Sequence, residues 1–180
     1  NTIAADRYGD ALYSDISVVP NVSISQYNSC IRGPLQNLIT ATGSFVAMEG
    51  SDSACEWGND PDTAPGIFGY DNLPKLETRN YGANANDSYW LANPDQLLEG
   101  FSPLIGKERV TQSIRTRHAF DLAEARIAGT DGLGAPGFNV DNIRQLLVGA
   151  NNHAASLVLD DVIDICQAEE IDPLAGITQT

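Results

Sequence analysis

The chain has 180 residues, of which 42% are hydrophobic and 19% are charged, a globular composition that excludes an intrinsically disordered protein. Asp and Glu number 24 against 10 for Lys and Arg, so the formal net charge is -14. Phosphate backbones and anionic lipids repel so acidic a surface, and no apolar run approaches the roughly 20 residues that span a bilayer. We therefore expect neither a nucleic-acid nor a membrane partner.

The first 20 residues predict a β-hairpin. A short strand over residues 2–5 is followed by turn chemistry over residues 6–10, where Gly9 can take a positive φ. Residues 11–19 alternate apolar and polar side chains as a half-buried strand does, and Pro20 ends that strand. Because a lone hairpin is marginal in water, we expect it to belong to a larger sheet with a neighbour that this chain does not supply.

The middle of the chain lacks regular periodicity. A short helix is predicted within residues 26–42, with Leu35, Leu38 and Ile39 on one face. Residues 43–104 are rich in Gly, Asp, Asn and Pro and show no sustained period of 2 or 3.6. Aromatic residues distributed through this stretch indicate that it is packed: Trp57, Phe68, Tyr70, Tyr81, Tyr89, Trp90 and Phe101.

The last third predicts helices. Residues 110–128 follow a helical pattern that ends at Gly129. Asn139 is a suitable cap for a helix over residues 140–148, and a final helix is predicted over residues 154–167. The apolar side chains expected to face inward from the second of these helices are Ile143, Leu146 and Leu147.

Few residues combine into a recognisable metal or nucleophile motif. His118 and His153 have no Ser or Cys at a motif spacing, so we interpret both as structural. The acidic groups at residues 60–62 and 160–161 lack the ligand spacing of a calcium loop and fit solvated carboxylates better. No CxxC or paired-His spacing indicates zinc. We expect no metal and no cofactor.

Three cysteines leave an odd count. Cys30 and Cys55 bracket a polar loop and are compatible either with a disulfide in an oxidising compartment or with two buried thiols. Cys166 lies in the predicted final helix.

Residues 84–94 crowd amide side chains and small polar groups beside Tyr89 and Trp90. Amides are neutral donors and can hold a developing oxyanion without a set pH. The same residues also fit a turn stabilised by Asx hydrogen bonds. Physical chemistry alone therefore leaves a functional and a structural interpretation open.

Several ordered motifs resemble the β-chain of the penicillin-acylase family of N-terminal nucleophile hydrolases, in the branch of aculeacin A acylase and acyl-homoserine lactone acylases. The resemblance covers residues 1–128 well and the final helices loosely. The matching stretches are Asn1-Thr2-x-Ala4-Ala5-Asp6, Ala11-Leu12-Tyr13, Val18-Val19-Pro20, Cys30 to Cys55-x-Trp57, Asn86-Asp87-Ser88-x-Trp90-Leu91-x-Asn93-Pro94, Leu98-x-Gly100-Phe101-Ser102-Pro103-Leu104 and Arg115-Thr116-Arg117.

This resemblance implies an α+β chain that is part of a four-layer αββα sandwich, with a single partial domain over residues 1–180. Its expected sub-regions are a hairpin (1–20), a loop-rich segment (21–105) and a helical segment (106–180). The family's catalyst is a serine at the N-terminus of the β-chain, and its oxyanion is held by a backbone N–H and by an asparagine side chain that corresponds to Asn86. A supporting arginine corresponds to Arg115, with Arg117 as the alternative.

The resemblance also implies a Cys30–Cys55 disulfide, an unpaired Cys166 and a bacterial periplasmic or secreted location. The chain begins with Asn1, whose amide is no nucleophile, so we expect an internal acylase segment that is inactive by itself. Its expected partners are the α-chain, the rest of the β-chain and an acylated amine substrate. Two alternatives are a free-standing acidic binding module and, less favoured, a processed chain with Thr2 as the nucleophile.

Overall fold

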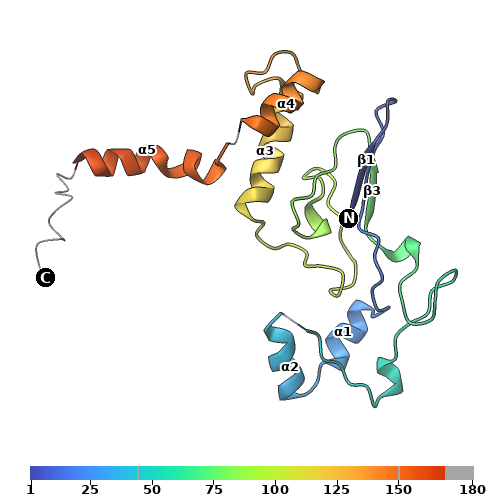
Figure 1. Cartoon of the computed structure of the whole chain (residues 1–180). Helices are drawn as coiled ribbons and strands as arrows, with labels where there is room; N and C mark the ends of the chain where they lie inside the picture. Colours follow the sequence, from blue (N-terminus) through green and yellow to red (C-terminus); the bar gives the residue numbers. More distant parts are fainter. Residues whose placement is uncertain (44, 150, 169–180) are drawn as a thin grey trace, which may run out of the picture. The chain divides into compact units, whose positions relative to one another are not determined.

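The computed structural model describes residues 1–43, 45–149 and 151–168, and its chain divides into two units, residues 1–112 and 113–180. The first unit carries a three-stranded antiparallel sheet of strands β1 (Thr2–Ala5), β2 (Ala11–Ser14) and β3 (Lys75–Thr78) in the order β1-β2-β3. Helices α1 (Ile24–Cys30) and α2 (Pro34–Ala41) belong to the same unit (Figure 1). The mixed α+β composition predicted from the sequence is confirmed, while the single-domain assignment stays a prediction.

The predicted hairpin is present, with a shorter second strand. The Asp6 carboxylate accepts the backbone N–H groups of Tyr8 and Asp10, and Gly9 has a φ of 93°, which closes the turn. Strand β2 ends at Ser14 rather than at Val19. The Asp15 N–H still donates to the Pro74 carbonyl at 2.8 Å, but Pro74 has no N–H to donate in return, so the ladder stops.

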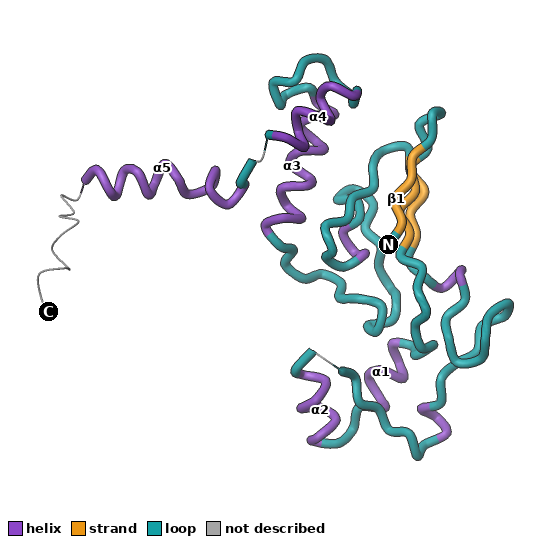
Figure 2. Tube along the Cα trace, viewed as in Figure 1, coloured by secondary structure: helices purple, strands orange, loops and turns teal. Residues whose placement is uncertain are grey.

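Strand β3 is the neighbour that the sequence was expected to lack. It pairs with β2, and Figure 2 draws the strands of this sheet side by side in orange. The pairing places Leu76 opposite Tyr13. The prediction of an unmet neighbour is therefore wrong on the β2 side. On the outer side of β1, no further strand pairs among the residues that the structure describes. Tyr13, Leu76, Tyr89 and Ala92 form the buried core of this unit.

The helix predicted within residues 26–42 is two helices. Ser23 caps α1 through a reciprocal pair of hydrogen bonds with Gln26. Gly33 and Pro34 separate α1 from α2, because the residue before a proline disfavours helical backbone angles and proline lacks the N–H that would continue the helix. Leu35 and Leu38 are 67% and 65% exposed, so the apolar face of α2 is uncovered in this unit.

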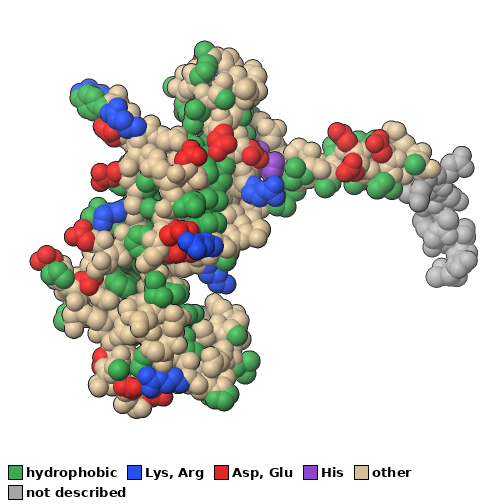
Figure 3. Space-filling model, turned by 180° about the vertical axis from the view of Figure 1, so that it is seen from behind, with side chains coloured by type: hydrophobic (Ala, Val, Ile, Leu, Met, Phe, Trp, Pro, Cys, Tyr) green, Lys and Arg blue, Asp and Glu red, His purple; other side chains and the backbone are tan. Residues whose placement is uncertain are grey.

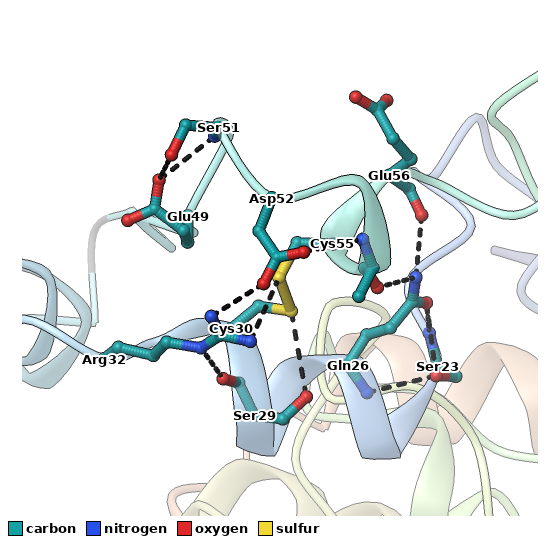
Figure 4. The surroundings of a disulfide bond; sticks show 11 residues. Ser23, Gln26, Ser29, Cys30, Arg32, Glu49, Ser51, Asp52, Cys55 and Glu56 are labelled. Atoms are coloured by element: carbon teal, nitrogen blue, oxygen red, sulfur yellow. Dashed lines mark hydrogen bonds and ion pairs between the residues drawn. A yellow bond between two sulfur atoms is a disulfide. The ribbon is translucent and has the colours of Figure 1, made fainter.

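Two devices organise the irregular segment between α1 and β3. Cys30 and Cys55 form a disulfide, confirming the predicted pair, and Arg32 beside it forms an ion pair with Asp52 at 2.8 Å (Figure 4). The Asp60 carboxylate accepts hydrogen bonds from the side chains of Asn21 (2.8 Å) and Asn72 (2.7 Å) and from the Gly69 N–H (2.7 Å). These bonds, that from Asn72 first, lower the pKa of Asp60 below its usual range.

The second unit contains helices α3 (Ile114–Ala128), α4 (Val140–Val148) and α5 (His153–Ala168). The predicted cap and stop are present: Asn139 accepts the Asn142 N–H, and Gly129 ends α3 with a φ of 70°. Ser113 caps α3 by accepting the Thr116 N–H. Helix α3 begins at Ile114 instead of at residue 110, because its cap is Ser113.

Arg126 is the largest fully buried side chain of this unit, with no exposed surface. Its guanidinium lies 3.0 Å from the Asp131 carboxylate and donates to the Gly134 carbonyl at 2.9 Å. The pair ties the glycine-rich loop that follows α3 back onto that helix. By contrast, the prediction that Ile143 and Leu147 of α4 face inward is wrong in this unit, because they are 44% and 79% exposed.

The apolar side chains of α5 are exposed as well. Figure 3 shows hydrophobic side chains along the surface of this helix. Each is between 42% and 60% exposed: Leu157, Val158, Leu159, Val162, Ile163 and Ile165. Cys166 is also exposed and free, as predicted.

Replacing both Cys30 and Cys55 with Ser should lower the free energy of unfolding of the first unit by about 3 kcal/mol, because the disulfide closes a long loop and restricts the unfolded chain. Urea titrations of the parent and the double variant, followed by circular dichroism, measure this difference. Cys166→Ser is the matched control and should leave the urea midpoint in place. Equal midpoints for the double variant and the parent would contradict a stabilising role.

Candidate functional site

Residues 83–93 form a closed loop whose two ends are joined. The Ala83 N–H donates to the Ala92 carbonyl at 2.8 Å, and the fully buried side chain of Asn93 donates to the Tyr81 carbonyl at 2.7 Å. Ser88 caps a short 3-10 helix over Tyr89–Leu91 near the end of this loop. The amide-rich stretch found in the sequence is therefore a loop with a fixed base.

Asn86 lies in the exposed part of this loop. Its φ of 68° places it in the left-handed region, which is uncommon for residues other than glycine and is tolerated best by Asn and Asp. Its backbone N–H donates to the Asn84 side-chain oxygen at 2.9 Å. The exposure of Asn86 is what the oxyanion role requires, and the role itself stays a prediction.

Asn84 is coupled to Asn86 through this bond, an Asx hydrogen bond of the kind that the amide-rich sequence left open. Its side-chain N–H₂ donates to the Asp87 carbonyl at 3.4 Å, so the side chain of Asn84 bonds to the backbone of both Asn86 and Asp87. Asn84 is thus part of the structure that holds Asn86.

Tyr89 anchors the loop in the core. The side chain is 1% exposed, and its ring meets that of Phe101 edge to face with centroids 5.2 Å apart. The Tyr89 hydroxyl donates to Glu108 Oε1 at 2.7 Å, and the same oxygen accepts the Phe101 N–H at 3.0 Å. Burial, followed by the hydrogen bond to Glu108, raises the pKa of the Tyr89 hydroxyl far above its ordinary value, so Tyr89 remains a neutral donor.

Trp90 is held by a second carboxylate. Its indole N–H donates to Glu99 Oε1 at 3.0 Å, while Arg109 donates to both oxygens of Glu99 at 2.9 and 2.6 Å. The hydrogen bonds from Arg109, with a smaller contribution from Trp90, lower the pKa of Glu99 to about 2. Glu99 and Glu108 hold the two aromatic side chains of this loop, and sequence analysis missed both because they are distant along the chain.

Arg115 and Arg117 lie in the first turn of α3 and are exposed. They belong to the second unit, whereas Asn86 belongs to the first. The supporting role assigned to Arg115 by resemblance stays a prediction.

The two histidines of the second unit lie against each other. The rings of His118 and His153 stack with centroids 4.9 Å apart, and His153 Nε2 lies 3.4 Å from an Asp121 oxygen.

A model of the penicillin amidase family matches residues 1–178, so the chain belongs to the penicillin amidase family. It is 45% identical to aculeacin-A acylase of Actinoplanes utahensis over 170 residues, which are 94% of this chain and 22% of that protein. It is 36% identical over 173 residues to the acyl-homoserine lactone acylase PvdQ of Pseudomonas putida, covering 96% of this chain and 20% of PvdQ. PvdQ of Pseudomonas fluorescens is 35% identical over 178 residues, 98% of this chain and 21% of that protein. The resemblance seen in the motifs is confirmed, and the chain spans 20 to 22% of the length of these relatives.

The contact between Trp90 and Glu99 should survive mild acid. Folding lowers the pKa of Glu99 from 4.5 to about 2. The ionised carboxylate therefore stabilises the folded chain fully above pH 4.5, and this stabilisation is lost as the pH falls through about 2. In the Trp57→Phe variant, Trp90 is the remaining tryptophan. Its fluorescence should stay constant as the pH falls past 4.5 and should change only when the pH approaches 2.

Glu99→Gln in the same background is the control, since it removes the ionisable group and should remove this transition. Circular dichroism over the same pH range separates a local change from unfolding. A fluorescence midpoint near 4.5 in the Trp57→Phe chain would contradict the strong pairing of Glu99 with Arg109.

Proposed function

We propose that this chain is one part of an acylase of the penicillin amidase family, and that the complete enzyme hydrolyses the amide that joins an acyl chain to an amine. The observation that carries the proposal is the placement of Asn86, an exposed amide on a loop whose base and core anchor are both fixed. The names of the relatives, aculeacin-A acylase and acyl-homoserine lactone acylase, support this class of reaction.

Asn86 acts in this proposal on the tetrahedral intermediate of amide hydrolysis. As the nucleophile attacks, the carbonyl oxygen acquires negative charge, and a donor that already points at that oxygen stabilises the transition state without reorganising. The family resemblance assigns the nucleophile to the serine at the N-terminus of the β-chain and the second donor to a backbone N–H. The left-handed backbone of Asn86 and its bond to Asn84 fix the point from which the amide side chain projects.

Arg115 is proposed to support the same site by its charge. A guanidinium is always protonated and offers several donors in one plane, so it orients polar neighbours at any pH at which the enzyme works. Arg117, two residues further along the same helical turn, is the alternative.

The remaining segments of the acylase are proposed as the partners of this chain, forming with it the αββα sandwich of the family. The exposed apolar side chains of α4 and α5 support this assembly, since apolar surface of this extent is normally buried against other protein. The disulfide supports a periplasmic or secreted location, because such bonds persist in oxidising compartments. None of the helices described here is both long enough and apolar enough to cross a bilayer.

Asn86→Ala in the complete enzyme should lower kcat by roughly 100- to 1,000-fold, equivalent to about 2.7–4 kcal/mol, because one oxyanion donor is lost. Stability should change much less than kcat: the side chain is exposed, and the main cost expected is that of placing Ala in a left-handed backbone conformation. Steady-state deacylation of a chromogenic acyl-amide and thermal unfolding of the same preparations measure the two effects.

The control must be chosen with the structure in view. Asn84→Ala is unsuitable because Asn84 holds the backbone of Asn86 and should also lower kcat. Asn80→Ala replaces another exposed asparagine of the same unit, outside the closed loop, and should leave kcat within a factor of about two. A complete enzyme whose kcat is indifferent to Asn86→Ala would remove Asn86 from the mechanism.

A further inference from the structure

Glu108 accepts the hydrogen bond of Tyr89, the side chain that anchors the closed loop of residues 83–93 in the core. One oxygen of its carboxylate receives both the Tyr89 hydroxyl (2.7 Å) and the Phe101 N–H (3.0 Å). Phe101 in turn packs edge to face on the Tyr89 ring. A single carboxylate oxygen therefore fixes the aromatic anchor of one segment and the backbone of another.

The segment that carries Glu108 also lies directly against the closed loop of residues 83–93. A Cβ atom placed on Gly106 would lie 2.8 Å from Ser88 Oγ and 3.1 Å from the Tyr89 ring, so a larger residue there would displace Ser88 Oγ or the ring. The Leu98 N–H donates to the Trp90 carbonyl at 3.1 Å on the same stretch. Residues 98–108 therefore support the half of the loop that follows Asn86.

Only two residues lie between Asn86 and Tyr89, and the base of their loop is closed by the bond between Ala83 and Ala92. The position of Tyr89 therefore limits where the short segment between them can place the amide of Asn86. Removing the Glu108 carboxylate would leave the buried Tyr89 hydroxyl without this acceptor, and an unsatisfied buried donor is destabilising. Movement of Tyr89 toward another acceptor relieves that cost and carries the loop with it.

We propose that Glu108 is a positioning residue for Asn86: it fixes Tyr89, and through Tyr89 the loop that presents the oxyanion donor. This inference rests on the proposed function of Asn86. In this proposal Glu108 acts only by holding Tyr89 and Phe101, so its effect on catalysis should pass entirely through Asn86. This dependence separates a positioning role from a general contribution to stability.

A double-mutant cycle in the complete enzyme tests the dependence. Glu108→Ala alone should lower kcat by about 10- to 100-fold, since a misplacement of about 1 Å can cost that much, with a smaller effect on KM. On the Asn86→Ala background, the same substitution should lower kcat by less than about twofold, because no donor remains to be misplaced. Equal losses of kcat in the two backgrounds would overturn the proposal.

Two further variants keep the test decisive if Glu108→Ala does not fold. Tyr89→Phe removes the hydroxyl and keeps the ring packing, and it should show the same dependence on Asn86. Glu108→Gln retains an oxygen acceptor and should recover most of the kcat lost in Glu108→Ala. If Tyr89→Phe lowers kcat equally in both backgrounds, the positioning role is overturned.

A matched control and the single Asn86 variant separate this inference from the proposed function. Glu77→Ala removes an exposed glutamate of β3 in the same unit, and it should have little effect on kcat in either background. If Asn86→Ala alone leaves kcat unchanged, the proposed function fails, whatever Glu108→Ala does. If Asn86→Ala lowers kcat but Glu108→Ala leaves it unchanged, the function stands and the positioning role falls.

Discussion

The buried hydroxyl of Tyr89 requires an acceptor, and the structure of the candidate site depends on how that requirement is met. Tyrosine brings a large apolar ring into the core together with one polar atom that loses its water there. Glu108 supplies the acceptor, and the same oxygen binds the backbone at Phe101. Because this one buried hydroxyl needs an acceptor, the segment that contains Phe101 and Glu108 is held against the segment that contains Tyr89. The loop needs no regular secondary structure to be well fixed.

The two units bury their side chains to different extents. In the first, the sheet, the disulfide and the Asp60 hydrogen bonds hold a chain that is mostly loop. In the second, α3 and its loop are closed by the buried Arg126, whereas α4 and α5 expose much of their apolar surface. A domain complete in itself would bury such faces against its own core. A chain that spans about 20% of the length of PvdQ from Pseudomonas putida is expected to leave them open.

Local sequence signals predicted the features that local physics decides. The turn at Gly9, the cap at Asn139 and the stop at Gly129 each follow from one or two residues. One error arose where a distant residue decides. Strand β2 ends early because its partner at that register is Pro74, more than 50 residues away.

The candidate site shows the same division. Asn86 was found because its neighbours match a family motif, and its exposure agrees with the proposed role. Glu99 and Glu108 were missed because a solvated glutamate and one that accepts a hydrogen bond from Trp90 or Tyr89 look alike in sequence. The helix break at Gly33 and Pro34 was readable from the sequence, and the apolar pattern of residues 35–39 concealed it.

The disulfide has a topological consequence for how this chain withstands proteases. Cys30 and Cys55 enclose Arg32 as the one tryptic site between them. A cut after Arg32 would leave both products joined through sulfur, so the chain would still migrate as one species until a reductant separated the pieces. Hydrolysis of the backbone inside this ring therefore need not detach the hairpin from the loop that carries Asn86. The hairpin and the loop that carries Asn86 are therefore connected in two ways, through the peptide backbone and through the Cys30–Cys55 disulfide.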